Sequence, residues 1–224
     1  MPRSLDILLS LIGLLLFLPF LIIISILVKV SSRGPILFKQ VRVGKNGRPF
    51  TLIKFRTMYT NNQNILVTAK NDSRITPIGK MLRYLKLDEL PELINVLKGD
   101  LSLVGPRPEV PKYVDMNNQM WQRVLQIRPG LTDPVTIKFR NEESILGRVK
   151  GDKERFYLDI LQPYKLRGYI DYIEKKDISF DFLILFTTIK AIIFPNSYQA
   201  PELNELENVY LDRPNENNNS EKER

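Results

Sequence analysis

The chain lacks two residue types that carry much of enzyme chemistry: its 224 residues include no cysteine and no histidine. Without cysteine there is no disulfide framework, no thiol nucleophile and no thiolate metal site. Without histidine the commonest general base and the commonest zinc ligand are missing. Polar catalysis would therefore depend on Asp, Glu, Lys, Arg, Ser, Thr or Tyr. A metal bound by such side chains would be a hard ion such as Mg²⁺.

The usual nucleotide-binding fingerprints are also missing, since there is no glycine-rich loop of the GxGxxG or Walker type and no DxD motif. Basic residues, by contrast, are in excess. The net charge is +8, residues 201–224 carry −4, and the rest of the chain therefore carries +12. A basic body indicates an anionic partner, either nucleic acid, acidic lipid or a phosphorylated substrate. The polar composition of residues 196–224 predicts a disordered tail.

One long apolar run lies near the N-terminus, where residues 4–28 contain a single charge, Asp6. A helix of this length exceeds the roughly 30 Å of membrane hydrocarbon. Pro19 lies inside the run and predicts a kink. Basic residues on both flanks place the body in the cytoplasm. The residues alone leave two topologies open: a kinked span, or a re-entrant helix that enters and leaves on the same face.

Residues 35–58 have the pattern of a β-hairpin, because two runs rich in Val, Ile, Phe and Thr flank a turn at Asn46-Gly47. Alternation along the second run places Lys54 and Arg56 on one face. The two cations are then expected to project side by side, either into solvent or toward an anion.

The stretch "KLDELPELINVLKGDLSLVGPRPE", residues 86–109, holds the most unusual polar pattern. Before it, Thr76 is expected to cap a helix; within it, a second helix is expected to end at Gly99. The neighbouring carboxylates of Asp88 and Glu89 are either helix-start acids or a functional pair. The two prolines of "GPRP" predict a rigid loop that holds Arg107 in a defined pose.

Two later stretches carry weaker signals. "RPGLTDP", residues 128–134, is turn-forming. Residues 177–194 are strongly apolar and interrupted by charge, which favours a helix that lies in the membrane interface or closes the core.

Taken together, these motifs resemble the monotopic phosphoglycosyl transferases, also called bacterial sugar transferases. The resemblance runs from about Arg3 to about Phe194 and rests on the apolar helix with its proline and on "SSRGPILFKQVRVGKNGRPFTLIKFRTM", "RITPIGKMLRYLKLDELPELINVLKGDLSLVGPRPE" and "RPGLT". Three positions depart from the family pattern: Leu18, Lys86 and Asp133. The last leaves the choice of sugar open.

The resemblance implies an enzyme at the cytoplasmic face of the bacterial inner membrane. It would transfer a sugar-1-phosphate from a UDP-sugar to undecaprenyl phosphate, release UMP and require Mg²⁺. Asp88 and Glu89 would form the catalytic and metal-binding pair, with Asp88 as nucleophile through a covalent phosphosugar intermediate.

The resemblance also implies phosphate-binding cations and an architecture. Lys54, Arg56, Arg107 and Arg83 would bind substrate phosphate, and Pro19 would bend a re-entrant membrane helix. The expected fold is α+β and predominantly helical. Residues 1–30 would form the membrane helix, 31–195 a compact cytoplasmic catalytic domain with a small β-hairpin and interfacial amphipathic helices, and 196–224 the tail.

Partners expected from the resemblance are the UDP-sugar, undecaprenyl phosphate and membrane lipid, with a homodimer as an open possibility. Two rival functions fit parts of the sequence. A basic, membrane-anchored scaffold without catalysis explains the charge and the apolar helix but not the carboxylate pair before "GPRP". A nucleic-acid binder should interleave aromatic and basic residues on one face, which this chain does not clearly do, so no nucleic-acid partner is expected.

Overall fold

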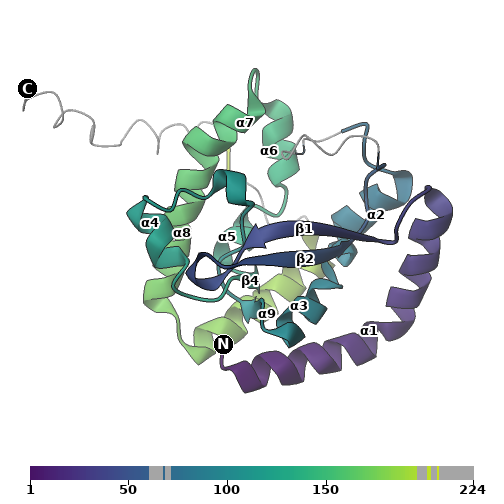
Figure 1. Cartoon of the computed structure of the whole chain (residues 1–224), viewed down its shortest axis with the longest axis horizontal. Coiled ribbons are helices and arrows are strands. Elements are labelled where there is room, and N and C mark those ends of the chain that lie inside the picture. Colours follow the sequence, from purple (N-terminus) through teal and green to yellow (C-terminus); the bar gives the residue numbers. More distant parts are fainter. Residues whose placement is uncertain (61–67, 69–71, 196–200, 203–205, 207–224) are drawn as a thin grey trace, which may run out of the picture.

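The structure is a computed structural model that describes residues 1–60, 68, 72–195, 201–202 and 206. Helices predominate in this part of the chain, around two small sheets (Figure 1). The elements in chain order are α1 (Arg3–Ser31), β1 (Leu37–Val43), the turn η1 (Lys45–Gly47), β2 (Pro49–Phe55), α2 (Pro77–Leu85), η2 (Leu87–Glu89), α3 (Glu92–Lys98), β3 (Ser102–Val104), η3 (Pro111–Tyr113), α4 (Gln119–Val124), β4 (Gly130–Thr132), α5 (Pro134–Lys138), α6 (Glu142–Arg148), α7 (Lys153–Phe156), the π-helical turn η4 (Tyr157–Leu161), α8 (Gln162–Lys175) and α9 (Ile178–Ile193).

The predicted hairpin is present: β1 and β2 pair antiparallel with Val43 opposite Pro49. Asn46 and Gly47 both adopt positive φ in the turn, which is why this dipeptide favours hairpins. Of the two alternatives left open for β2, the structure disfavours a solvated face, because Leu52 and Ile53, which point to opposite faces, are both buried. The strand is therefore covered on two sides, and a cation on it lies near the interior.

The two helices around the carboxylate pair begin and end as the sequence predicts. The Thr76 side chain accepts a hydrogen bond from Gly79 N at the start of α2. Gly99 adopts a φ of 93° and ends α3. Between the helices, Lys86 adopts a left-handed conformation and the short 3-10 turn η2 carries Asp88 and Glu89. This tight connection places the pair just before the first turn of α3.

The stretch "RPGLTDP" contains a short strand as well as a turn. Residues of β4 pair parallel with β3, Ser102 opposite Gly130 and Val104 opposite Thr132. The two chains come close enough that a Cβ on Gly130 would lie 2.1 Å from Gly105 N. Glycine is therefore required at this crossing, and it brings the "GPRP" and "RPGLT" motifs side by side.

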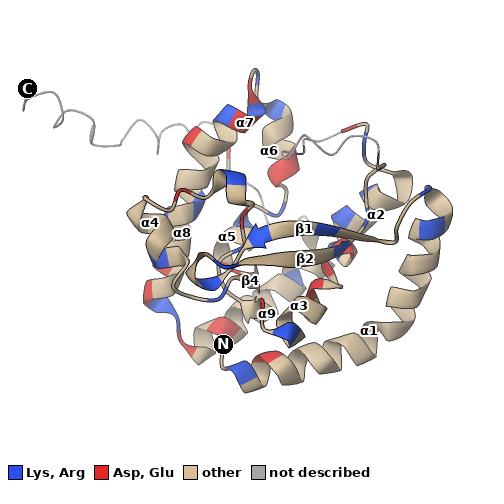
Figure 2. Ribbon diagram, in the orientation of Figure 1, with Lys and Arg blue, Asp and Glu red and all other residues tan. Residues whose placement is uncertain are grey.

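The apolar helix α1 bends partway along its length and both halves follow the same body (Figure 1). It contains Pro19 and is long and apolar enough to cross a membrane by length and composition. At its N-terminal end, Arg3 donates to Val96 O and Leu97 O at the end of α3. Nearby, the buried Asp6 accepts hydrogen bonds from Ser102 Oγ and Leu103 N. Charged residues lie only near the two ends of α1 (Figure 2).

The C-terminal helices cover the core. α7, η4 and α8 form a continuous helical stretch that contributes Tyr157, Leu161, Leu166 and Tyr169 to the largest apolar cluster. α9 packs against α5 and β3. α9 buries Asp181, Ile184 and Ala191 and leaves a second apolar face exposed, so it both closes the core and presents apolar surface.

The predicted tail contributes one residue to the core. Leu206 is only 1% exposed and lies in the largest apolar cluster, while the predicted disorder of the tail stays a prediction. Residues 196–200, 203–205 and 207–224 of the predicted tail lie outside the described residues.

Candidate active site

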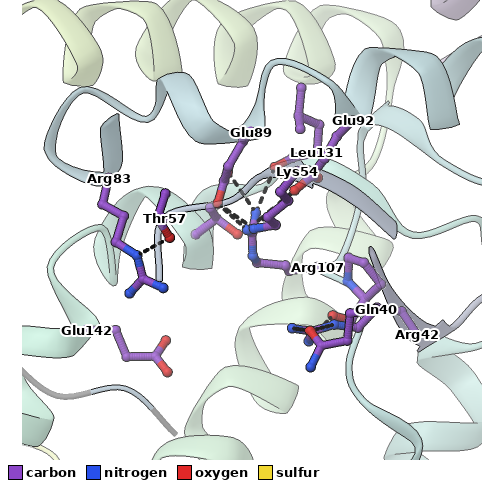
Figure 3. Close-up of polar contacts among 12 residues, drawn as sticks. Gln40, Arg42, Lys54, Thr57, Arg83, Glu89, Glu92, Arg107, Leu131 and Glu142 are labelled. Atoms are coloured by element: carbon purple, nitrogen blue, oxygen red, sulfur yellow. Dashed lines mark hydrogen bonds and ion pairs between the residues drawn. The ribbon is translucent and has the colours of Figure 1, made fainter. Parts of the chain in front are cut away.

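Four charged side chains meet in what we call the ion cluster, formed by Lys54, Glu89, Glu92 and Arg107 (Figure 3). Lys54 Nζ lies 2.9 Å from Glu89 Oε1 and 3.1 Å from Glu92 Oε1. Arg107 donates to both oxygens of Glu89, with Nη1 3.2 Å from Oε2 and Nη2 bonded to Oε1. The predicted site residues Lys54, Glu89 and Arg107 therefore come together although they lie on three different elements.

Asp88 lies beside this cluster and is 7% exposed. Its Oδ1 is buried and has no hydrogen-bond partner in the described part of the chain. Burial, followed by the charge of Glu89, raises the pKa of Asp88, while Lys54, Lys86 and Arg83 oppose the rise. A desolvated carboxylate with a free oxygen is a stronger nucleophile than one bound by donors.

The two glutamates of the cluster are perturbed in opposite directions. Burial alone would raise the pKa of Glu89, but Arg107 and Lys54 outweigh it and hold that pKa well below its usual range. For Glu92 burial prevails and raises the pKa despite Lys54. Glu89 is therefore the ionised partner of the two cations, and Glu92 is the more weakly compensated acid.

Asn95 of α3 fixes how the cluster is assembled. Its side chain accepts a hydrogen bond from Ile53 N at 3.1 Å and donates to Thr51 O at 2.7 Å. These two bonds join α3 to β2 on the strand segment next to Lys54. The buried amide therefore sets the distance between Lys54 and the glutamates at the start of α3.

The rigid loop around Arg107 has its own supports. Arg42 of β1 donates to Pro108 O at 3.1 Å and to Glu109 Oε1 at 3.2 Å. Arg107 Nη1 also donates to Leu131 O at 3.3 Å. The loop is therefore held from β1 and from β4, as expected for a side chain needed in one pose.

Arg56 does not join Lys54, and the prediction that the two cations project side by side is wrong. β2 ends at Phe55, and Arg56 is 4% exposed. Its guanidinium donates to Arg33 O at 2.7 Å and to Ser32 O at 2.7 Å, and Nη2 lies 3.3 Å from Val28 O. These carbonyls lie at and after the C-terminal end of α1, where backbone acceptors lack helical partners. The described contacts of Arg56 are to the chain at the end of α1, and its predicted role in binding phosphate stays a prediction.

Arg83 lies beside the carboxylate pair without touching it (Figure 3). Its Nε donates to Thr57 Oγ1 at 2.9 Å and its Nη1 pairs with Glu143. Its charge still favours the ionised form of Asp88.

Asp133, the residue that departs from the family pattern and was expected to affect the choice of sugar, is fully buried. Its side chain caps α5 by accepting hydrogen bonds from Val135 N and Thr136 N.

Sequence reasoning missed Glu92 and Asn95. The signal for Glu92 was its spacing, because residues three apart on a helical turn share a face and Glu92 follows Glu89 by three. The contacts of Asn95 reach a strand more than 40 residues earlier and leave no local pattern.

The described residues contain no ready-made group of three acidic metal ligands. Asp88 offers a free carboxylate oxygen, while both oxygens of Glu89 are bound to Lys54 and Arg107. Mg²⁺ is commonly held by one or two carboxylates together with substrate phosphates. The donor set therefore fits Mg²⁺ only when substrate oxygens complete the coordination.

Fold and site define a class of protein: a basic, membrane-associated domain whose buried carboxylate stands beside cations suited to phosphoryl groups. The comparisons give the family. The model of the bacterial sugar transferase family matches residues 1–195. The chain therefore belongs to the bacterial sugar transferase family.

Curated relatives refine this assignment. The chain is 34% identical over 207 residues to the exopolysaccharide production protein ExoY of Rhizobium meliloti, covering 85% of this chain and 84% of that protein. It is 34% identical to a UDP-glucose:undecaprenyl-phosphate glucose-1-phosphate transferase of Klebsiella pneumoniae, covering 86% of this chain but 40% of that protein. A UDP-N-acetylgalactosamine-undecaprenyl-phosphate N-acetylgalactosaminephosphotransferase of Aeromonas hydrophila is also 34% identical, with 85% and 43% covered. These names support classification of the chain as a phosphoglycosyl transferase. Relatives named for two different sugars are equally similar, so overall identity does not select the sugar.

Proposed function

We propose that the chain transfers a sugar-1-phosphate from a UDP-sugar to undecaprenyl phosphate and releases UMP, as the first membrane step of a bacterial surface glycan pathway. The observation that carries the proposal is the free, buried Oδ1 of Asp88 beside the ion cluster. The names of the relatives support the two substrates.

The chemistry proceeds in two balanced displacements. An Asp88 oxygen attacks the sugar-bearing phosphorus of the UDP-sugar, and the bond from that phosphorus to the UMP oxygen breaks. This leaves an acyl phosphate that carries the sugar on Asp88. A phosphate oxygen of undecaprenyl phosphate then attacks the same phosphorus, and the Asp88 carboxylate leaves. No proton has to move, so the reaction needs no histidine.

Charge neutralisation is the main requirement, because each step brings an anion to an anion. Lys54 and Arg107 would transfer from Glu89 to the donor phosphates, and the planar fork of Arg107 suits two phosphate oxygens at once. Mg²⁺, held by Asp88 with Glu89 as a second candidate ligand, would add Lewis-acid stabilisation of the phosphoryl oxygens.

A UMP-release assay tests the reaction. Purified protein is incubated with a panel of UDP-sugars, with undecaprenyl phosphate present or absent, and with Mg²⁺ or a chelator. One sugar should support turnover with lipid and Mg²⁺. Without lipid, that sugar should release up to one UMP per active site and add one phosphosugar mass to Asp88. UMP release that always requires lipid, with no adduct, would establish direct transfer. Absence of UMP under all conditions would favour the scaffold.

For location, we propose that α1 is re-entrant and that the body lies on the cytoplasmic face of the inner membrane. The supporting observation is that both ends of α1 bond to the same body, through Arg3 and Asp6 at one end and Arg56 at the other. A helix that spanned the membrane would have to break one set of bonds. The exposed apolar face of α9, with Leu183, Phe186 and similar residues, would lie in the interface.

Cysteine labelling tests the topology, and the absence of native cysteine makes each introduced thiol unique. Single cysteines at Ser4 and Ser32 should both be protected from a membrane-impermeant reagent in intact spheroplasts and react after lysis. Labelling of the Ser4 position from outside would establish a spanning helix.

A further inference from the structure

Glu92 is a buried acid whose position the reaction itself does not explain. It opens α3, its side chain is inaccessible, and it follows Glu89 by three residues. Its Oε1 lies 3.1 Å from Lys54 Nζ and 3.9 Å from Arg107 Nη2. These are ion-pair distances, but neither carboxylate oxygen has a hydrogen-bond partner in the described part of the chain. Helix starts favour acids in solvent, yet a fully buried, incompletely bonded carboxylate costs free energy that a neutral side chain would avoid.

The second relevant feature is competition for the cations. Lys54 Nζ lies between Glu89 and Glu92 at nearly equal distances, and Arg107 contacts both acids. A donor diphosphate can be bound by these cations only if it displaces Glu89. The side chain of Glu92 is 1% exposed and that of Glu89 is 16% exposed, so Glu89 is the acid that an entering anion reaches first.

We propose that Glu92 is a positioning residue that retains Lys54 and, at longer distance, Arg107 at the site while the donor diphosphate replaces Glu89 as their partner. It does not touch the reacting atoms. Its negative charge also moderates the affinity of the cations for phosphate, so that UMP can leave after the first displacement. This inference rests on the proposed function and assigns a role to a residue outside the carboxylate pair.

The test separates binding from turnover. Glu92→Gln keeps the shape and removes one negative charge near the cations. UDP, titrated calorimetrically in the presence of Mg²⁺, should bind at least about fivefold more tightly, the effect of one unit charge removed about 4 Å away at the dielectric of water, and more tightly still at a lower dielectric. The kcat for UMP release should fall about 10- to 100-fold, the usual loss when a residue that orients a ligand-binding group is changed. Higher UDP affinity together with a lower kcat is not expected from a variant that is merely misfolded, because misfolding lowers both.

Two further variants make the result specific. In a Lys54→Met background, Glu92→Gln should change UDP affinity less than it does in the wild-type background, because the nearer of the two cations that Glu92 contacts is already gone. Glu174→Gln, which removes a glutamate from an exposed ion pair with Arg123, is the matched control and should leave both quantities unchanged. If Glu92→Gln does not fold, Glu92→Asp is the alternative, because it keeps the negative charge but moves it farther from Lys54 by the length of one methylene group. That variant should lower kcat with UDP affinity near wild type.

Unchanged UDP affinity and kcat in Glu92→Gln would overturn the role of Glu92, as would weaker binding with a matching loss of kcat/KM. An effect of Glu92→Gln on UDP affinity that is as large in the Lys54→Met background as in the wild-type background would overturn it as well. A wild-type protein that binds UDP without turning over any UDP-sugar would instead overturn the proposed function. The UDP affinities of wild type and Glu92→Gln could still be compared in that case. A wild-type protein that neither binds UDP nor releases UMP would overturn both.

Discussion

The guanidinium groups of Arg56 and Arg107 differ in their exposure and in the partners that they bind. Arg56 is 4% exposed and donates to carbonyl oxygens of Val28, Ser32 and Arg33. Arg107 is 25% exposed at its side chain and pairs with the carboxylates of Glu89 and Glu92. Carbonyls at a helix end are fixed by the backbone and cannot be exchanged, whereas a carboxylate partner can be displaced by another anion. An arginine bound to carbonyls therefore holds the fold together, while one bound to carboxylates near the surface remains available to a phosphate.

Asp88→Asn gives the largest effect expected on the Arg107 side of this comparison. The amide keeps the shape but cannot form the acyl phosphate, so UMP release should fall by at least about 10³-fold. The phosphosugar adduct should disappear from the mass spectrum of the intact protein. Retention of more than a tenth of the wild-type rate would mean that Asp88 is not the nucleophile.

Arg107→Lys should reduce UMP release by about 100-fold, because a point charge replaces a planar fork that can bind two oxygens. The melting temperature should change little, since lysine still pairs with Glu89. Steady-state kinetics and differential scanning fluorimetry on the same preparation would measure both. A variant with normal kinetics would remove Arg107 from the phosphate site.

Arg56→Met should show the reverse pattern. Carbonyl oxygens at the end of α1 lose their donors in a buried place, which should cost about 2 kcal/mol of unfolding free energy. Activity per folded molecule should stay near wild type. Chemical denaturation in detergent, paired with the UMP assay, measures both quantities. A loss of activity without a loss of stability would restore Arg56 to the phosphate-binding cations.

A smaller effect concerns the stability of Asp88→Asn, measured without added divalent cation. Burial and the charge of Glu89 raise the pKa of Asp88 in the folded protein above the ordinary 3.8. The Asp88 carboxyl therefore binds a proton more tightly in the folded state than in the unfolded state. As pH rises from 3.8 to the pKa of Asp88 in the folded protein, the free energy of unfolding of the wild-type protein falls. Asparagine does not ionise. The variant should therefore unfold at a higher temperature than wild type at pH 7, and the difference should vanish below about pH 3.8. A variant less stable at pH 7 would contradict this assignment.

Much of the local structure could be predicted because its causes are local. The turn at Asn46-Gly47, the Thr76 cap and the end of α3 at Gly99 each depend on residues within one turn of themselves. The rigid loop at Arg107 follows from two prolines. Strand β4 escaped prediction because three residues are too few to display an alternating pattern.

The candidate site was predicted only in part for the same reason. The sequence pointed to Asp88, Glu89, Lys54 and Arg107, which the fold brings together at the start of α3. The sequence pattern wrongly placed Arg56 beside Lys54. Side-chain alternation ends with β2 at Phe55, and Arg56 donates instead to carbonyl oxygens such as Ser32 O.

By itself, then, the sequence determined the hairpin, the two helices around the carboxylate pair, the pair itself and the family resemblance, because helix caps, turn residues and motif spacing act over short stretches of chain. Only the tertiary structure decided which cations reach the carboxylates, that Glu92 is buried between them, and that both ends of α1 bond to one body. Those outcomes depend on contacts between residues that are often far apart in the chain, and on the high cost of leaving buried charges and carbonyls unpaired, which no local pattern encodes.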